Sequence, residues 1–492
     1  MKYGFPRKHM LGMAIAVIVS GQAFATGNEA VINQTSAAAT VGHTAEVTQS
    51  GDINLAIVEQ SGEGNTTSVA QNGVWHEAFT FSEGQENQIR VEQTDDWHVS
   101  YVDVAGQENT ATTTQSGFFN QSEVVVSGDI NDAVVMQAGE VNEAFITLDG
   151  STNLAEIEQT GNANWANAGF SGDNNELNAV QTGDNNEAGM FNLAGNSNTF
   201  DAEQTGNANV GGVVGLAGDN NNIYVLQDGD ANGFIAFDVM GNDNVVDVMQ
   251  QGNANSFLLE PLAGDNNLVL IDQRGDGNTV DAPTGLVGND NQIDVWQRGN
   301  TNSAMFATEG DQHNVEIHQH GDDNVAVMAL AGSANIGTIY SNGDANQAGI
   351  GLNGANNTAE ISQSGDLNLA VVDLIGDENT VSIEQSGMAN EAVLTSEAAV
   401  SSNTVAIEQD GGINLVDILL AGNANSIDIL QSGSGNWVAG NDGYFAVTGD
   451  SGAVTITQQG SDNLVLGGQG GSNNLMSVTQ VGDFNTAIVV QN

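Results

Sequence analysis

The chain has 492 residues, no cysteine, and 62 acidic residues against 6 basic ones, which gives a formal net charge of −56. This balance excludes nucleic-acid binding, which needs clustered lysine and arginine, and the missing cysteine excludes disulfides, thiolate zinc sites and cysteine nucleophiles. Glycine is abundant (62 residues) and proline is rare (3 residues), which indicates short strands joined by many tight turns.

Residues 1–25 have the pattern of a secretory signal peptide. Lys2, Arg7 and Lys8 precede an apolar stretch that is too short to cross a bilayer, and an A-x-A cleavage pattern ends this stretch. We therefore expect residues 26–492 to be exported as the working protein. No later segment is long and apolar enough for membrane insertion.

An eleven-residue repeat organises the rest of the chain. From Gly51 onward glycine recurs at this spacing, and asparagine follows most of these glycines three positions later. Two positions before each glycine, glutamine alternates with an apolar residue, so the full repeat has 22 to 23 residues in two similar halves. Near both ends of the chain glutamine fills both rows. Short insertions fall between Gly183 and Gly299 and near Val400, and a longer one follows Gly433.

Each half-repeat has the alternation of a β-strand. In residues 150–159, Asn153, Ala155, Ile157 and Gln159 share one face, and the residues between them are mostly charged. A helix would need apolar residues at i, i+3 and i+4, which this register lacks. The sequence therefore predicts an all-β protein: a β-solenoid of strand-turn-strand-turn coils, about 20 in number, stacked in an amyloid-like manner at roughly 4.8 Å. Stacking also lets buried Asn and Gln side chains bond to their equivalents in adjacent coils, which removes the cost of burying an unpaired amide.

The repeat resembles the curlin consensus, Q-x-G-x-x-N-x-A-x3-Q. The match is complete from Gln49 to Gln60 and recurs near the end of the chain, whereas central repeats often carry only its first half. The residues that we expect to form structural ladders are Gln49, Gly51, Asn54, Gln60, Gly62, Asn65, Gln159, Gly161, Asn164, Gln204, Gly206, Asn209, Gln385, Gly387, Asn390, Gln480, Gly482, Asn485 and Gln491.

The chain thus resembles curli subunits, the secreted functional-amyloid proteins of bacterial biofilm. This resemblance implies export through a dedicated outer-membrane channel, a nucleator subunit, and assembly into pilus-like fibres on the cell surface that serve adhesion and matrix building. The chain departs from the family in its many coils, its acidity, and the Leu or Val that replaces one glutamine row in most central coils. An apolar row gives a drier core, which favours stable folding of a single chain.

Histidines and tryptophans interrupt the repeat at a few positions. His43, His76, His98 and His313 occupy the asparagine position, where we expect them to act as hydrogen-bonding substitutes for asparagine. Trp165, Trp296 and Trp437 fall at outward positions, and we interpret them as scattered single aromatics that need no ligand.

The sequence contains two groups of residues with the donor types of a metal site. His318 and His320, near Glu316 and Asp322, have donor types that suit a transition metal, but Gln319 between them is the expected inward residue, so both imidazoles should face solvent. Aspartates that follow the turn glycines would form stacked carboxylates that repel one another. The calcium-solenoid motif G-G-x-G-x-D does not repeat, so we expect diffuse divalent cations at most, with no cofactor and no defined metal site.

Three classes of function are candidates for a repeat of this kind. The leading hypothesis is a structural protein that adds end to end to other copies and forms cross-β fibres. The alternative is a monomeric acidic solenoid that displays a binding surface, which is weakened because the outward positions show no regular array of one residue type. An enzyme is not expected, since no catalytic constellation stands out from the repeat.

Overall fold

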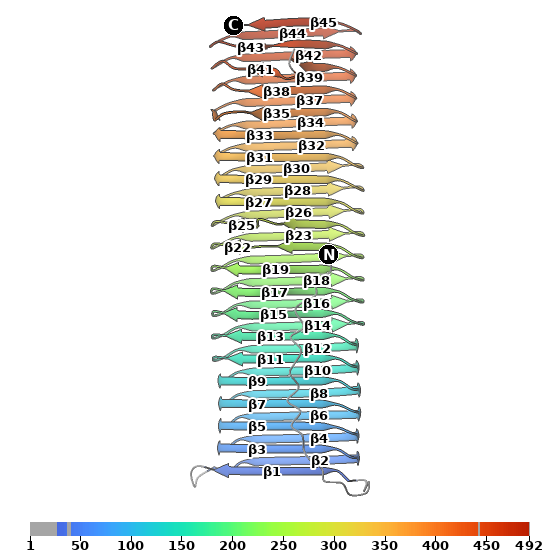
Figure 1. Cartoon of the computed structure of the whole chain (residues 1–492), viewed down its shortest axis with the longest axis vertical. Helices are drawn as coiled ribbons and strands as arrows, with labels where there is room; N and C mark the ends of the chain where they lie inside the picture. Colours follow the sequence, from blue (N-terminus) through green and yellow to red (C-terminus); the bar gives the residue numbers. More distant parts are fainter. Residues whose placement is uncertain (1–26, 37–40, 441–442, 492) are drawn as a thin grey trace. The chain divides into compact units, whose positions relative to one another are not determined.

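The computed structural model describes residues 27–36, 41–440 and 443–491. The signal peptide predicted for residues 1–25 therefore lies outside the described residues. All regular structure in the described part is β-strand, and parallel strands build a β-solenoid of about 21 turns, which confirms the predicted fold class (Figure 1). Among the same residues, no helix is long and apolar enough to cross a membrane.

The chain divides into two compact units. Unit 1 comprises residues 1–193 and 202–212, and unit 2 comprises residues 194–201 and 213–492. Three strands run through the residues where the division falls, namely β15 (Glu187–Ala194), β16 (Thr199–Thr205) and β17 (Val210–Ala217).

The remaining strands belong to one unit each. Unit 1 contains β1 (Glu29–Ser36), β2 (Thr44–Asp52), β3 (Leu55–Glu63), β4 (Thr66–Val74), β5 (Glu77–Gln85), β6 (Gln88–Asp96), β7 (Val99–Gln107), β8 (Thr110–Phe118), β9 (Gln121–Asp129), β10 (Asp132–Glu140), β11 (Glu143–Asp149), β12 (Leu154–Asn162), β13 (Trp165–Ser171) and β14 (Glu176–Thr182). Unit 2 contains β18 (Asn222–Asp228), β19 (Gly233–Met240), β20 (Val245–Gln251), β21 (Ser256–Leu259), β22 (Leu262–Ala263), β23 (Leu268–Arg274), β24 (Thr279–Ala282), β25 (Leu286–Val287), β26 (Gln292–Arg298), β27 (Ser303–Asp311), β28 (Asn314–His320), β29 (Val325–Ser333), β30 (Ile336–Asn342), β31 (Gln347–Ala355), β32 (Thr358–Asp366), β33 (Leu369–Asp377), β34 (Thr380–Met388), β35 (Glu391–Ser396), β36 (Val400–Ser401), β37 (Thr404–Gly412), β38 (Leu415–Leu420), β39 (Ser426–Ser434), β40 (Trp437–Ala439), β41 (Phe445–Val447), β42 (Ala453–Ser461), β43 (Leu464–Gln469), β44 (Leu475–Val481) and β45 (Thr486–Gln491).

Period-two burial explains why these segments are strands. In β12, Ala155, Ile157 and Gln159 are fully buried, and the residues between them lie at the outer surface. β12 pairs in parallel with β10, which brings Ala133 beside Ala155. Because the repeat length equals one coil, each side chain stacks on the equivalent side chain of the next coil.

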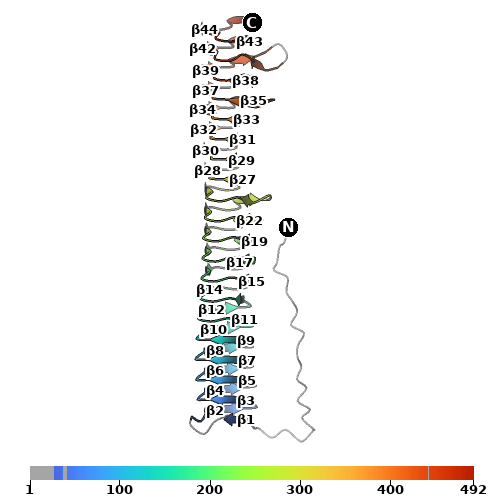
Figure 2. The ribbon, with the colours of Figure 1, turned by 90° about the vertical axis from the view of Figure 1, so that its left-hand side faces the viewer.

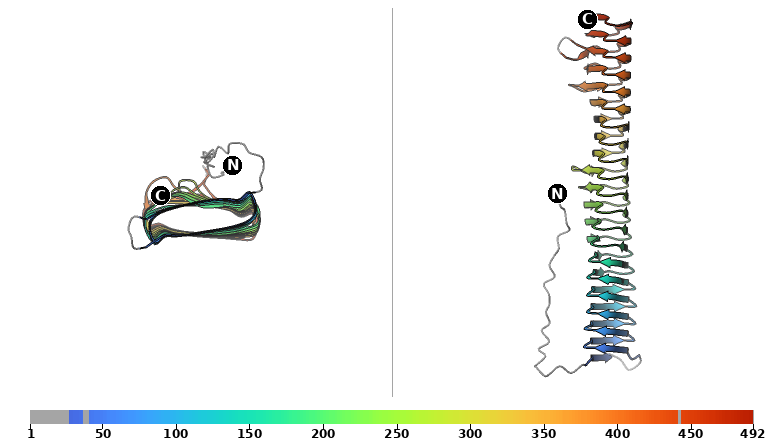
Figure 3. Two further views of the ribbon diagram at one scale, coloured as in Figure 1. Left: turned by 90° about the horizontal axis from the view of Figure 1, so that it is seen from below. Right: turned by 90° about the vertical axis from the view of Figure 1, so that its right-hand side faces the viewer.

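Each coil is a flattened loop whose two long sides are strands of two facing sheets (Figure 3). In unit 1 the even-numbered strands β2 to β14 carry the glutamine row, and we call them the glutamine sheet; the odd-numbered strands β1 to β13 form the leucine sheet. In unit 2 the glutamine sheet consists of β18, β20, β23, β26, β28, β30, β32, β34, β37, β39, β42 and β44, and its other strands form the leucine sheet.

The insertions in unit 2 all fall in the leucine sheet. They split its strands between Leu259 and Leu262, between Ala282 and Leu286, after Ser396, and after Ala439. Figure 2 shows the longer of these segments leaving the stack on one side of unit 2. The strands of the glutamine sheet in unit 2 are continuous within the described residues, so this sheet has the more regular outer surface.

Candidate assembly site: turns, amide ladders and outermost strands

The turn glycines are fixed by close approach of successive coils. Gly161 has φ of +114°, a conformation that L-residues rarely adopt. A Cβ atom on Gly161 would lie 2.1 Å from the carbonyl oxygen of Gly183 in the next coil. At Gly387 the corresponding distance, to the oxygen of Gly411, would be 1.9 Å. Glycine is therefore required at these positions both by backbone conformation and by space.

The asparagine after each turn forms a continuous buried ladder. The backbone N–H of Asn164 donates to Oδ1 of Asn142 (3.0 Å), and its side-chain Nδ2 donates to the same oxygen (3.1 Å) and to the carbonyl of Gly183 (2.8 Å). Oδ1 of Asn164 in turn accepts two bonds from Asn186. The amide is almost fully buried, and it is satisfied because one asparagine stands above it and another below it.

The glutamine ladder has a defined direction. Nε2 of Gln159 donates to Oε1 of Gln181 in the next coil (2.9 Å), and Oε1 of Gln159 accepts from Nε2 of Gln137 (2.8 Å). The second hydrogen on Nε2 is donated to the backbone carbonyl of Glu143 in the leucine sheet (3.0 Å). Where one glutamine follows another, the amide donor thus points toward the following coil, and the row links the two sheets.

The predicted ladder residues occupy the expected rows. In unit 1, Gln49 donates to Gln71 (2.8 Å) and Gln181 donates to Gln204 (2.9 Å). In unit 2, Gln385 donates to Gln409 (2.8 Å). The asparagines of the set each bond to the equivalent residue of an adjacent coil; they are Asn54, Asn65, Asn164, Asn209, Asn390 and Asn485. One position interrupts the glutamine row in unit 2, where Ser341 bonds to Gln363 at 3.3 Å.

The histidines at asparagine positions are also ladder members. Nδ1 of His98 accepts the backbone N–H of Asn120 (3.1 Å), and its Nε2 donates to the carbonyl of Thr94 (2.7 Å). The ring stacks on that of His76 with centroids 5.2 Å apart, and both side chains are fully buried. This burial lowers the pKa of His76 and lowers the pKa of His98 to about 4. Only the neutral imidazole can accept the ladder bond.

The turn aspartates have a role that sequence reasoning missed. Oδ1 of Asp184 accepts both the backbone N–H (2.8 Å) and the side-chain amide (3.0 Å) of Asn162. In unit 2, Asp344 donates its backbone N–H to Asp366 Oδ1 at 3.0 Å. These carboxylates therefore form a third, solvent-exposed ladder. The signal, an Asp directly after the turn glycine, is visible in the sequence, where we interpreted it as a row of carboxylates that repel one another.

The outermost strands leave their ladders unfinished. In unit 2, β44 pairs with β42 and β45 pairs with β43, and neither strand has a second partner among the described residues. Gln480 and Gln491 each donate one amide hydrogen to a backbone carbonyl, that of Leu464 and that of Leu475 respectively. The second amide hydrogen, which in internal coils bonds to the next glutamine, has no acceptor among the described residues. Apolar side chains are exposed beside them, including Ile488 (68%).

The first strands of unit 1 show the complementary arrangement. Gln34 donates to Gln60 (2.7 Å) and Gln49 donates to Gln71 (2.8 Å). In later coils the Oε1 atom of each glutamine accepts a bond from the glutamine of the preceding coil. The Oε1 atoms of Gln34 and Gln49 have no such donor among the described residues. Unit 1 thus presents amide acceptors at its first coil, and unit 2 presents amide donors at its last described coil.

Comparison with known protein families gives a result that agrees with this architecture. The model of the curlin associated repeat matches residues 44–73, 106–139, 128–161, 172–206, 288–321, 354–387, 376–411, 422–460 and 449–482, which together cover more than half of the chain. Nearly all of these segments begin and end at turn glycines, and most of them span three half-repeats, which is about one and a half coils. No curated protein matches the chain. The repeat, its ladders and the family match lead to one conclusion: the chain belongs to the curlin repeat family.

Proposed function

We propose that the chain is an exported curli-like subunit that adds to other copies end to end and forms cross-β fibres for adhesion and biofilm matrix. Its family and its solenoid fold indicate a structural rather than an enzymatic protein. One observation carries the proposal: the last described coil offers amide donors, and the first described coil offers amide acceptors, that have no ladder partner among the described residues. The last coil of one copy therefore fits the first coil of another in the same register as an internal coil.

The exposed strands supply the other contributions to this contact. Each open strand carries unpaired backbone N–H and C=O groups, which template a further parallel strand. The inward residues Ala487 and Val489 are only half-buried in β45, whereas equivalent residues inside the stack are fully buried. Covering them would remove apolar surface from water. The acidic surfaces of two copies repel each other, so added salt should promote assembly by screening.

The double substitution Gln480→Leu and Gln491→Leu should slow fibre elongation roughly thirtyfold, because each of the two lost amide bonds contributes about 1 kcal/mol to the contact between copies. The folded subunit should keep its structure, since both residues lie in the outermost coil. Elongation from preformed seeds, followed by thioflavin T fluorescence, measures the effect. The exposed Gln459→Leu variant is the control, because this residue lies outside the ladders. Equal elongation rates in both variants would contradict the role of the ladders.

Electron microscopy of residues 26–492 after dilution from denaturant tests the proposal as a whole. Unbranched fibres that bind thioflavin T support it. Persistent single particles would favour the alternative, a monomeric acidic solenoid that displays a surface.

Export itself is tested by the N-terminal residue of the protein recovered outside cells, which should be Thr26 if residues 1–25 are a signal peptide. A curli-type secretion channel, a nucleator subunit and diffuse divalent cations remain part of this proposal as partners.

A further inference from the structure

A groove of roughly 300 Å³ lies on the outer face of the glutamine sheet in unit 2. Its outward side chains are Trp296 and Arg298 of β26, His318 and His320 of β28, and Tyr340 of β30. We call this set the Trp296 groove. Gln319 and Ser341 of the glutamine row also line the groove, but none of the five outward side chains takes part in the amide ladders, and the assembly proposed above does not use them.

An aromatic strip runs along the groove. Parallel register places Trp296 beside His318, and His318 beside Tyr340, in three successive coils. The ring centroids of Trp296 and His318 are 5.4 Å apart, and those of His318 and Tyr340 are 5.0 Å apart in an edge-on arrangement. Trp296 remains 41% exposed. Trp296 is therefore part of a cluster, whereas the sequence suggested a single scattered aromatic.

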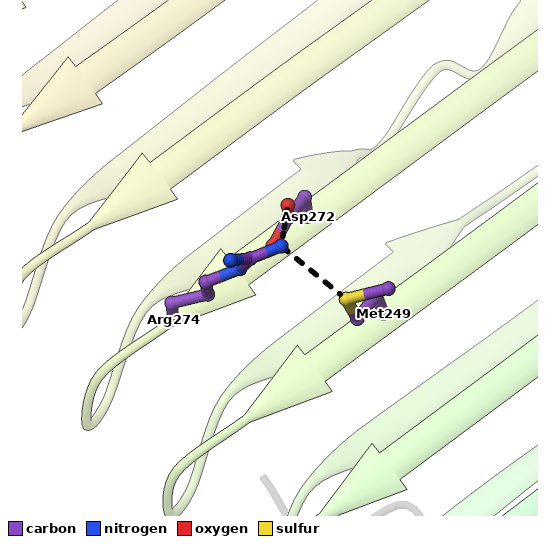
Figure 4. A network of polar contacts seen from close by, with 3 residues as sticks. All are labelled: Met249, Asp272 and Arg274. Carbon is purple, nitrogen blue, oxygen red and sulfur yellow. Dashed lines mark hydrogen bonds and ion pairs between the residues drawn. The ribbon is translucent and has the colours of Figure 1, made fainter.

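One side of the strip is cationic. The described residues contain three arginines, and register places two of them, Arg274 and Arg298, in adjacent coils, with His320 in the next coil. The guanidinium of Arg274 is held by both carboxylate oxygens of Asp272 and by the sulfur of Met249, at distances of 2.8–3.6 Å (Figure 4).

Arg298 differs from Arg274 in having no acidic partner. Its guanidinium carbon lies 4.4 Å from the centroid of the Trp296 ring, and no carboxylate of the described residues forms an ion pair with it. In a chain with 62 acidic residues, an arginine that is held against an aromatic ring and left without a carboxylate is available to an external anion.

The other side of the strip offers hydrogen-bond acceptors. Asp294 and Glu316 are paired in register and lie two residues before Trp296 and His318 on the same outward face, about 7 Å away along the strand. The Tyr340 hydroxyl donates to Glu316, whose Oε1 also lies 3.5 Å from Nε2 of His318. Across the groove the surface therefore changes from carboxylate acceptors, through aromatic rings, to a free guanidinium.

We propose that the Trp296 groove binds the uronic-acid units of an acidic polysaccharide. A sugar of this class has a carboxylate for Arg298, a C–H face for Trp296, and hydroxyl donors for Asp294 and Glu316, so it uses all three parts of the surface. A neutral sugar has no carboxylate to pair with the Arg298 guanidinium. An acidic protein segment, such as the surface of a second copy, brings a carboxylate for Arg298 but lacks the adjacent hydroxyl donors that a uronic-acid unit offers to Asp294 and Glu316.

Titration of the full chain with a hexamer of galacturonate, followed by calorimetry, tests this proposal; a hexamer of cellulose is the neutral probe. The galacturonate hexamer should bind at least tenfold more tightly than the neutral hexamer. Arg298→Gln and Trp296→Ala should each weaken galacturonate binding at least tenfold. The matched controls are Arg90→Gln, which removes the same charge from unit 1, and Trp437→Ala, which removes a tryptophan that is 50% exposed on the leucine sheet; both should bind as the parent does.

Three results would overturn the proposal. The first is equal affinity for the two hexamers, and the second is unchanged affinity in Arg298→Gln. The third is that Trp296→Ala alters the sedimentation of the chain but not its sugar affinity, which would make the groove a contact between copies. Fibre growth of the same variants, followed with thioflavin T, should equal that of the parent, so a failure of the sugar proposal is distinguishable from a failure of fibre assembly.

Discussion

Gly161→Ala should destabilise the coils around it by about 4 kcal/mol, because it combines backbone strain with a steric overlap. The new Cβ atom would lie 2.1 Å from the carbonyl oxygen of Gly183 and 2.8 Å from its carbonyl carbon, and these are backbone atoms that cannot rotate away. Since each coil contacts only its neighbours, the effect should be largest in the adjacent coils. Hydrogen exchange of the full chain, resolved by mass spectrometry over residues 132–205, measures it.

Gly169→Ala is the matched control for Gly161→Ala. Gly169 lies eight residues away at an outward position of β13, and the nearest atoms to its Cβ would be 3.6 Å away, an ordinary contact. Alanine in a strand also loses less conformational freedom on folding than glycine, so this variant should be neutral or slightly more stable. Similar exchange rates in the two variants would show that the close approach of the turns is not what requires glycine.

Acidification from pH 6.5 toward pH 4 should destabilise the coils that contain His76 and His98. The pKa of both imidazoles is lower in the folded chain than the ordinary value of about 6.5, because both are buried. The unfolded chain then binds more protons in this range, so the free energy of unfolding falls as the pH falls. For His98, whose pKa is about 4, the loss amounts to about 3 kcal/mol. In addition to the cost of burying a charge, a protonated Nδ1 of His98 would face the N–H of Asn120, donor against donor.

Replacement of both histidines by asparagine should remove this loss, because asparagine restores the ladder found at the equivalent position of other coils. The stacked indoles of Trp75 and Trp97, 5.0 Å apart, report on this region through their fluorescence during denaturant unfolding at each pH. Asp95 and Asp96 lie near both imidazoles and interact with them electrostatically, so the comparison is between the parent and the double variant. A histidine titration midpoint near 6.5 for His98, measured by NMR, would contradict the prediction.

The ladder positions were predictable because the repeat carries its own register. Asn153, Ala155, Ile157 and Gln159 have one period along the strand and another from coil to coil, and both are visible in the sequence. A buried amide must be bonded, and in a stack of identical coils the only partners that recur at every level are its own equivalents. The direction of the glutamine ladder was not predictable, since it depends on which amide hydrogen faces the carbonyl of the opposite strand, as Gln159 does toward Glu143.

The Trp296 groove could not be inferred from the repeat. Arg274 and Arg298 are 24 residues apart, whereas Arg298 and His320 are 22 residues apart, and the register of β23, β26 and β28 depends on where the insertions are accommodated. The structure places the extra residues in the leucine sheet, where β24 and β25 are separated by a short loop, and keeps the glutamine sheet continuous. Outward residues obey no repeat constraint, so their neighbours in space follow only from this register.

The sequence by itself determined the strands, the coil length, the turn glycines and the buried amide rows, because these features follow from local alternation and from a period that every coil shares. Only the tertiary structure decided the stacking of His76 on His98, the hydrogen bonds of the turn carboxylates, and the meeting of Trp296, Arg298 and Tyr340 on one face. Buried positions are constrained by the same packing and hydrogen-bonding requirement in every coil, so the repeat specifies them. Surface positions and insertions are free of that requirement, so their contacts depend on how neighbouring coils align in three dimensions.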